Sequence, residues 1–322
     1  MIKPSEAELM TKVAWLYYIG DLNQAQVSNR LGLTRARVNK LLQNSRENGI
    51  VSINVNRKNL GLLELEEQIS KHFNLKFCTV TPELGLDTDQ PSHASFARRA
   101  VGNQTSKFLR AKLSESPKLT IGTGWGRTLN QLSKNIAGLH APQAKFVSLM
   151  GSLTANSAFN PFEVVQSMAN STSGEGFFLP VPYIADSLKD KKTLLSQRIV
   201  KNIMAMARNT DIALISVGEM TENSFLLKQG LVNKTELEEL KKVGAIGDTN
   251  GIFFDSAGLP VNHELNTRTI AVEFKYLKQA ETVLLSAGTA KLEATVGILT
   301  SGIITGLIID GDSAIKIAKI IV

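Results

Sequence analysis

Strand-like and helix-like segments alternate from Lys76 to the end of the chain, and this alternation constrains the fold more than any other feature. It predicts an α/β fold in which helical crossovers join the strands of a mostly parallel sheet. Helical composition is clearest in 125–137, 188–208 and 289–300. The strand candidates are 76–81, 118–122, 145–150, 176–181, 211–217, 269–274, 282–287 and 303–309.

Such sheets bind ligands at the carboxyl ends of their strands, so loops that follow strands are the places to look for a site. In the first candidate loop a strand runs into a glycine-rich turn and a helix start, where backbone N–H groups can hold an anion. The spacing is not that of a dinucleotide-binding loop, and a purely structural turn is the alternative. Its residues are Gly122, Thr123, Gly124, Trp125, Gly126, Arg127 and Thr128.

Two further loops carry polar side chains among small residues. Asp248 and Asn250 stand between glycines, where they can bond to hydroxyls, although a turn that opens a strand is the alternative reading. Lys291 follows a predicted strand at a helix start. A lysine there is unfavourable beside the positive helix end unless an anion is bound, and a side chain that extends to solvent is the alternative.

A helix, a glycine turn and a second helix are predicted over 23–49. Asn23 can cap the first helix, and Gly32 stands where the chain turns sharply. Thr34 caps the second helix, predicted over 34–48. Inward positions are apolar or small, so the segment has the pattern of a helix-turn-helix motif.

The second helix of this motif is predicted to lie in the major groove of DNA. Arg and Lys can bond guanine, and Asn and Gln can pair with adenine, whereas Gln24, Arg37 and Arg46 suit phosphates. A plain helical hairpin with a solvated basic face is the alternative. The predicted DNA-binding residues are Gln24, Thr34, Arg35, Arg37, Asn39, Lys40, Gln43 and Arg46.

Positive charge is concentrated near the N-terminus. The formal net charge is +7, and residues 1–58 hold nine Lys and Arg against four acids. A basic segment on a near-neutral body is typical of a polyanion-binding protein. Beyond the second helix, 50–55 alternates like a strand and predicts a small wing, and the polar segment 56–59 predicts a domain boundary.

The single cysteine, Cys78, excludes an internal disulfide and favours a reducing compartment. Its apolar neighbours predict a buried strand residue. We see no secretory signal in the first residues, and the apolar runs are far shorter than the ~20 residues of a spanning helix. We therefore expect a cytoplasmic protein without a membrane span.

Catalytic patterns are not recognisable in the sequence. The four histidines are scattered without metal-ligand spacing, and no Ser-His-Asp or Cys-His arrangement can be assigned. Binding is therefore better supported than turnover, and we expect no catalytic residue, metal or cofactor.

Five segments, in this order, resemble the SorC (SorC/DeoR-type) family of sugar-responsive bacterial regulators over nearly the whole chain. The resemblance implies a winged-type helix-turn-helix, an effector domain related to sugar-phosphate isomerases and a homotetramer. It also implies control of a sugar or polyol catabolic operon by a phosphorylated effector. The matching segments are 16–53, IGTGWGRTL at 121–129, DIALISVGE at 211–219, VGAIGDTNGIFFDSAGLPV at 243–261 and 284–310.

Carried over by motif, the resemblance implies that 122–128 holds the phosphate and that Asp248 and Lys291 contact the effector. Asn250 would line the pocket, with Gly151, Ser152 and Gly218 at its floor. The chain departs from the family at Thr289, which replaces a glycine, and at Thr249-Asn250.

We therefore expect two domains, a DNA-binding domain at 1–56 and an effector-binding and oligomerisation domain at 57–322. Double-stranded operator DNA, a small sugar or sugar phosphate and further copies of the chain are the expected partners. A sugar-phosphate isomerase fused to a DNA-binding module is the chief alternative. An architectural DNA-binding protein whose large domain only oligomerises is a third possibility.

Overall fold

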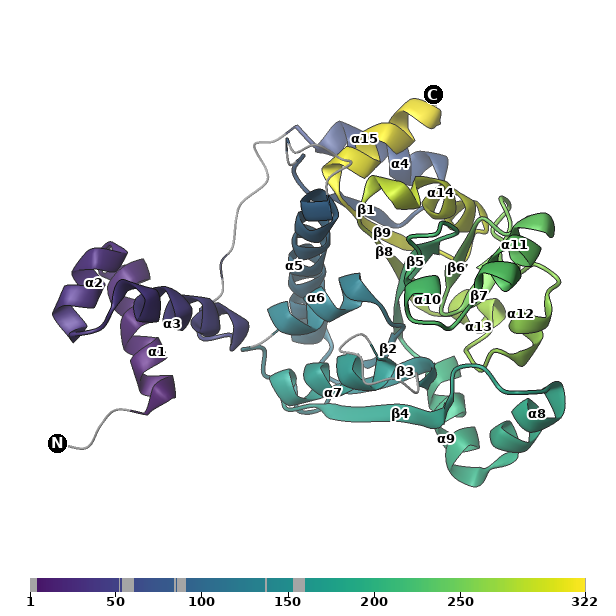
Figure 1. Cartoon of the computed structure of the whole chain (residues 1–322), viewed down its shortest axis with the longest axis horizontal. Helices are drawn as coiled ribbons and strands as arrows, with labels where there is room; N and C mark the ends of the chain where they lie inside the picture. Colours follow the sequence, from purple (N-terminus) through teal and green to yellow (C-terminus); the bar gives the residue numbers. More distant parts are fainter. Residues whose placement is uncertain are drawn as a thin grey trace.

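The computed structural model describes residues 5–51, 53, 61–83, 85, 91–136, 138–152 and 160–321. Figure 1 shows a small helical cluster at the N-terminus and a larger α/β unit. The elements of the N-terminal cluster are α1 (Glu6–Ala14), the π-helix η1 (Trp15–Ile19), α2 (Gln24–Leu31) and α3 (Arg35–Glu47).

The predicted helix-turn-helix is confirmed as local structure. The Asn23 side chain accepts from the first turn of α2, and the Thr34 hydroxyl accepts from the first turn of α3. Gly32 joins the two helices with a φ of 64°, which costs glycine little. For the predicted wing at 50–55, the described residues Ile50, Val51 and Ile53 form no strand, and the others lie outside the described residues.

The larger unit is built on a parallel sheet with the strand order β1-β9-β8-β5-β2-β3-β4. Its strands are β1 (Phe77–Val80), β2 (Thr120–Thr123), β3 (Lys145–Ser152), β4 (Glu175–Pro182), β5 (Ile212–Glu219), β8 (Glu281–Ser286) and β9 (Gly306–Ile309). The predicted parallel α/β class is therefore confirmed. Cys78 is buried in β1, as predicted.

The strand predicted at 269–274 is wrong. Thr269 and Ala271 form only isolated antiparallel bridges, and helix α13 (Phe274–Leu277) begins at the end of the segment. Its apolar residues are buried because they pack across the ends of β3 and β4, and this burial produces a strand-like pattern without a ladder.

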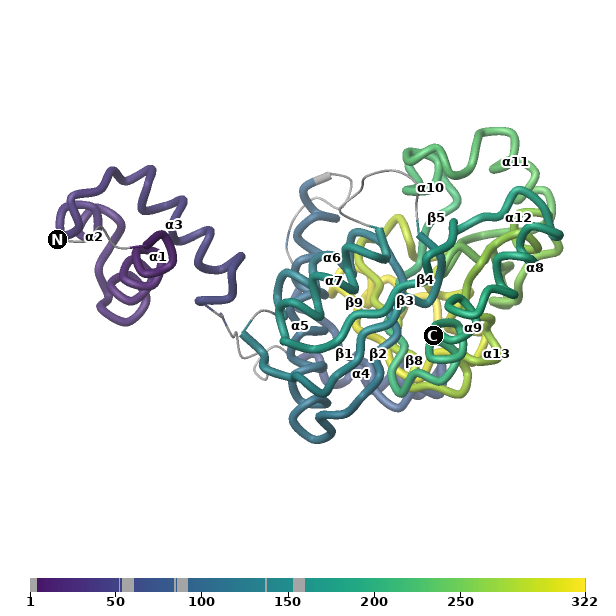
Figure 2. Tube along the Cα trace, turned by 90° about the horizontal axis from the view of Figure 1, so that it is seen from below, coloured from purple at the N-terminus to yellow at the C-terminus, as the bar shows by residue number. Residues whose placement is uncertain are grey.

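Helices cover both faces of the sheet, and the core lies between them and the strands. One face packs on α5 (Pro91–Glu115), α6 (Arg127–Asn135) and α7 (Pro161–Thr172), which lie together in Figure 2. The other face packs on α4 (Leu63–His72), α9 (Arg198–Arg208), α14 (Leu292–Thr300) and α15 (Gly311–Ile320). The other helices are α8 (Leu188–Ser196), α10 (Phe225–Lys228), α11 (Lys234–Lys242), α12 (Glu264–Arg268) and the 3₁₀ turn η2 (Thr289–Lys291).

A hairpin of β6 (Gly247–Thr249) and β7 (Ile252–Phe254) extends from β5, with which β6 pairs antiparallel. Its turn is Asn250-Gly251, with φ values of 48° and 70°. Positive φ at both turn residues is the requirement of a two-residue hairpin turn, which Asn-Gly meets best. A hairpin thus stands where a loop was expected around Asp248 and Asn250, and the Asn-Gly pair is its signal in the sequence.

Within the described part of the chain, no helix is both long enough and apolar enough to cross a membrane. The helix predicted over 188–208 is two helices, because Gln197 is extended with a ψ of 135°. The 25-residue helix α5 was not among the predicted segments.

Candidate functional site

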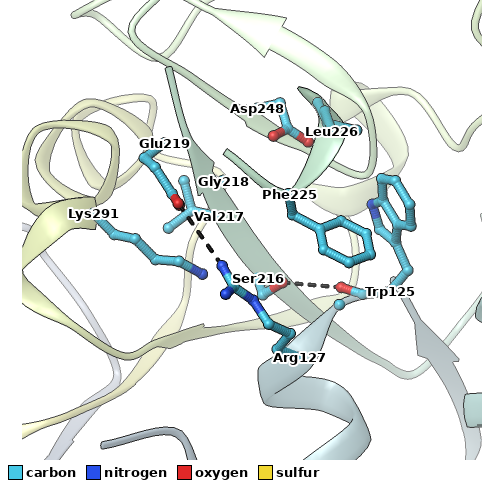
Figure 3. A pocket seen from close by; sticks show the side chains of 11 residues that line it. Trp125, Arg127, Ser216, Val217, Gly218, Glu219, Phe225, Leu226, Asp248 and Lys291 are labelled. Atoms are coloured by element: carbon cyan, nitrogen blue, oxygen red, sulfur yellow. Dashed lines mark hydrogen bonds and ion pairs between the residues drawn. The ribbon is translucent and has the colours of Figure 1, made fainter. Parts of the chain in front are cut away.

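The sheet has a switch point between β2 and β5. The strands β3 and β4 continue outward from β2, whereas β8 continues from β5 in the opposite direction. Loops that leave such a point diverge and open a crevice at the carboxyl edge of the sheet. A pocket lies there (Figure 3), lined by Trp125, Gly126, Arg127, Ser216, Val217, Gly218, Glu219, Phe225, Leu226, Asp248 and Lys291.

The β6–β7 hairpin brings Asp248 into this pocket. Asp248 pairs with Gly218 in the antiparallel ladder between β5 and β6. Its side chain accepts a hydrogen bond from the backbone N–H of Gly251 at 3.2 Å, across the hairpin turn. Asp248 is 5% exposed, and its carboxylate lies directly against the bare Cα of Gly218.

Charged side chains from three elements meet in the pocket. Arg127 at the start of α6 lies 3.8 Å from the carboxylate of Glu219 at the end of β5. Lys291, from η2 after β8, is 9% exposed, and Figure 3 shows its ammonium group directed toward Arg127 and Glu219. Burial lowers the pKa of Lys291, the charge of Arg127 lowers it further, and Glu219 raises it.

Asp248 is the second carboxyl group of the pocket. Burial raises its pKa to about 7, against the opposing effects of the Gly251 N–H and the Lys291 charge. The carboxyl is therefore partly protonated at neutral pH. Two cationic side chains, Arg127 and Lys291, and two carboxyl groups, Glu219 and Asp248, therefore line the same pocket.

The start of α6 offers further donors to an anion. Its N-cap is Gly126, with a φ of 115°, and no side chain caps the first turn. The hydroxyl of Thr128, in the same turn but outside the pocket lining, is buried and has no hydrogen-bond partner among the described residues. Backbone N–H groups at an uncapped helix start bind anions well, because they point outward along the helix dipole.

Aromatic rings close the pocket on its other side. The ring of Trp125 lies 5.6 Å from that of Tyr183 and 5.1 Å from that of Phe225, centroid to centroid. Asn250 is 2% exposed, and both polar atoms of its amide lack partners among the described residues. A Cβ on Gly124 would stand 2.3 Å from the Asn250 oxygen, so the amide lies directly against the glycine loop.

The pocket gathers Trp125, Gly126, Arg127, Gly218, Asp248 and Lys291 from the predicted effector-binding set. Its lining also includes residues that the sequence analysis missed, namely Ser216, Val217, Glu219, Phe225 and Leu226. The sequence contains a feature that points to Glu219, because this residue directly follows Gly218 at the end of a predicted strand. No sequence feature points to Phe225 and Leu226, because only the tertiary fold brings α10 over the crevice.

The other predicted residues do not line this pocket, namely Gly122, Thr123, Gly124, Thr128, Gly151, Ser152 and Asn250. A Cβ on Gly122 would stand 2.5 Å from the side chain of Leu149, and one on Gly151 would stand 2.5 Å from the carbonyl oxygen of Pro182. These two glycines are therefore required by strand packing. Ser152 lines a separate pocket beside Tyr183.

A buried polar cluster supports the loop that carries Lys291. His93 of α5 lies 2.9 Å from a carboxylate oxygen of Asp312, and these two residues and Asp310 could together hold a metal ion. Asp310 accepts hydrogen bonds from the backbone N–H groups of Gly288 and Ser313. Both carboxylate oxygens of Asp310 therefore accept hydrogen bonds from the backbone, and these bonds connect the end of β9 to the loop after β8.

The predicted DNA-binding residues are mostly exposed on α3. Some of them have partners within the chain. Arg37 forms an ion pair with Glu6, and Gln43 donates to Glu47 at 2.9 Å. Arg46 donates to the hydroxyl of Tyr18 at 3.1 Å. Arg35, Asn39 and Lys40 share the exposed face of α3, and Gln24 is half-buried at the start of α2.

The chain matches known proteins over nearly its whole length. The family described as "Putative sugar-binding domain" matches residues 57–319. The erythritol catabolism regulatory protein EryD of Brucella abortus is 28% identical over 310 residues, which cover 96% of each chain. The transcriptional regulator LsrR of Escherichia coli is 27% identical over 318 residues, covering 98% of this chain and 95% of LsrR.

Among solved structures, the full-length sorbitol operon regulator SorC of Klebsiella pneumoniae has the same fold. Its TM-score is 0.71 at 24% identity, covering 96% of this chain and 98% of SorC. The family match, the relatives and the fold agree with the resemblance seen in the sequence. The chain belongs to the SorC family of sugar-binding transcriptional regulators.

Proposed function

We propose that this regulator binds operator DNA through α3 and senses a small phosphorylated sugar or polyol in the pocket between β2 and β5. The DNA-binding part is 1–56 and the effector-binding part is 57–322. The protein acts as a homotetramer that controls a catabolic operon. The names of relatives refer to erythritol catabolism and to the sorbitol operon, which favours a polyol as the parent compound.

One observation supports a phosphorylated effector over an unphosphorylated one. Arg127 and Lys291 line one pocket beside an uncapped helix start, together with the carboxyl groups of Glu219 and Asp248. Burial of the Lys291 ammonium group costs free energy, and a bound anion offsets part of this cost. A phosphoryl group is such an anion, and it also accepts from the N–H groups of α6. Asp248, partly protonated, can donate to or accept from a hydroxyl of the sugar.

Effector binding can change the affinity for DNA through thermodynamic linkage between the two binding sites. An effector that binds two conformations of the protein unequally shifts the balance between them, and DNA affinity changes by the same coupling free energy. Either sign is compatible with the site, since release of a repressor and recruitment of an activator use the same pocket.

The test is a thermal-unfolding screen of the full chain against matched pairs of compounds. Each pair is a polyol or sugar of four to six carbons and its phosphate ester. A ligand that binds only the folded state raises the unfolding midpoint by mass action. We expect stabilisation by phosphorylated members, and stabilisation only by unphosphorylated members would overturn the phosphate assignment.

Two further measurements separate the regulator from its alternatives. We expect the stabilising compound to change the affinity for selected operator DNA by at least fivefold in fluorescence anisotropy. An unchanged affinity would support a DNA-binding protein without ligand control. The same compound, incubated with the protein and followed by NMR, should stay unaltered, whereas isomerisation would support the enzyme alternative.

A further inference from the structure

One stripe of helix α5 touches both α6 and the loop that follows β8. Ala94, Arg98 and Gly102 are spaced four residues apart and so share one face of the helix. At one end, a Cβ on Gly288 would stand 3.5 Å from the Cβ of Ala94. At the other end, a Cβ on Gly102 would stand 2.8 Å from the Cβ of Gln131. Arg98 therefore lies on the part of α5 that faces the gap between α6 and the loop after β8.

Helix direction places Arg98 at the level of Arg127. Both α5 and α6 lead from one strand of the parallel sheet to the next, so they run in the same direction. Arg98 lies one turn before Gly102, and Arg127 lies one turn before Gln131. Because Gly102 and Gln131 are in contact, the two arginines stand side by side toward the carboxyl edge of the sheet.

Electrostatics supports this placement. Burial and, after it, the charge of Arg127 lower the pKa of Arg98 to about 10, against the opposing effect of Glu219. Arg98 in turn lowers the pKa of Lys291. Arg98, Arg127 and Lys291, from three separate elements, thus interact with one another and with the carboxylate of Glu219, and a bound anion would relieve the mutual repulsion of the three cations.

We propose that Arg98 is the third cation of the effector site and binds, with Arg127 and Lys291, the dianionic phosphoryl group of the effector. The inference rests on the proposed phosphate site. A guanidinium group can donate two parallel hydrogen bonds to phosphate oxygens, which adds geometric selection for a phosphoryl group over a carboxylate or a neutral hydroxyl. Helix α5 thereby becomes a part of the effector site.

The neighbouring arginine provides a matched control. Arg99 is exposed, and its guanidinium lies 4.2 Å from the ring centroid of Phe96 on the outside of the same helix. Arg98→Ala and Arg99→Ala therefore remove the same charge from adjacent positions of α5, one on the helix face that contacts α6 and one on the exposed side.

The experiment titrates the full chain with inorganic phosphate at pH 8 by calorimetry, and with each phosphorylated compound that stabilised it in the screen. We expect Arg98→Ala to weaken binding at least tenfold and Arg98→Lys, which keeps the charge, to weaken it less. Arg99→Ala should stay within twofold of the wild type. Without ligand, Arg98→Ala should unfold at the wild-type midpoint or above it, because a repulsion is removed, whereas loss of a purely structural arginine would lower the midpoint.

The failures are distinguishable. If Arg127→Ala loses phosphate while Arg98→Ala binds it as the wild type does, Arg98 is not part of the site, and the proposed function stands. If the wild type binds neither phosphate nor any phosphorylated compound, the proposed phosphate site fails and this inference fails with it. If Arg98→Ala unfolds early, Arg98→Met, which keeps the aliphatic stem, repeats the titration.

Discussion

The carboxylate of Asp248 lies against the bare Cα of Gly218, so close that a Cβ at residue 218 would stand 2.1 Å from its Oδ1. The two residues are partners in the β5–β6 ladder. Because the ladder holds both backbones in place, a side chain at 218 and the carboxylate at 248 cannot occupy this space together. The absence of a side chain at Gly218 therefore leaves the space that the Asp248 carboxylate occupies in the pocket.

Gly218→Ala tests this relationship. We expect a loss of about 1–3 kcal/mol in the free energy of unfolding, because the added methyl group overpacks a buried contact, together with weaker effector binding. Chemical denaturation measures the first effect. In an Asp248→Ala background the same substitution should cost at least about 1 kcal/mol less. An equal cost in both backgrounds would show that the methyl group clashes with something other than Asp248.

Asp248 predicts a pH dependence of stability. Burial raises its pKa from the ordinary value of 3.8 to about 7 in the folded protein. Between about pH 4 and pH 7 the folded state keeps a proton that the unfolded state has lost, so the free energy of unfolding falls as the pH rises through this window. Asp248→Asn stays neutral, so its stability relative to the wild type should increase from pH 4 to pH 8. Urea denaturation at several pH values measures the difference, and a difference that does not vary with pH would contradict the assignment.

Lys291→Met should raise stability while it removes function. The buried ammonium group is desolvated and lies near other cations, so an apolar side chain of similar length relieves a cost of about 1 kcal/mol or more. We expect a higher unfolding midpoint without ligand and no stabilisation by a phosphorylated effector. Lys316→Met, at an exposed position of α15, is the control and should change neither quantity. A Lys291→Met protein that still responds fully to the effector would exclude this lysine from the site.

Arg35 and Asn39 are expected to read base edges from the exposed face of α3. Replacing both with Ala should weaken binding to a duplex selected by the wild-type protein by about 1–3 kcal/mol per contact, with little effect on a scrambled duplex. Lys12→Ala removes one charge from α1, outside the turn motif, and should leave the ratio of the two affinities unchanged. Fluorescence anisotropy at constant salt measures both. Equal weakening on both duplexes would make these residues phosphate contacts.

Local chemistry accounts for what could be predicted from the sequence. The two helix caps and the glycine turn of the N-terminal motif act within a few residues. Asn23 and Thr34 accept hydrogen bonds from the next helical turn, and Gly32 supplies a positive φ. Their roles can therefore be predicted without knowledge of the tertiary fold. Apolar periodicity similarly predicted the strands of a parallel sheet. The parallel class alone then directed attention to the loops at strand ends, where Arg127, Asp248 and Lys291 belong.

Tertiary structure decided which of those loop residues meet. Arg127, Glu219, Asp248 and Lys291 come from α6, β5, β6 and η2, and no local pattern shows that they share a pocket. Neither Gly122 nor Gly151 lines the pocket, because strand packing requires each of them where the sequence suggested ligand contact. The sequence by itself determined the elements and the edge of the sheet, because caps, turns and periodicity are short-range. The charge balance of the pocket depends on side chains that are distant along the chain, and only packing sets their distances.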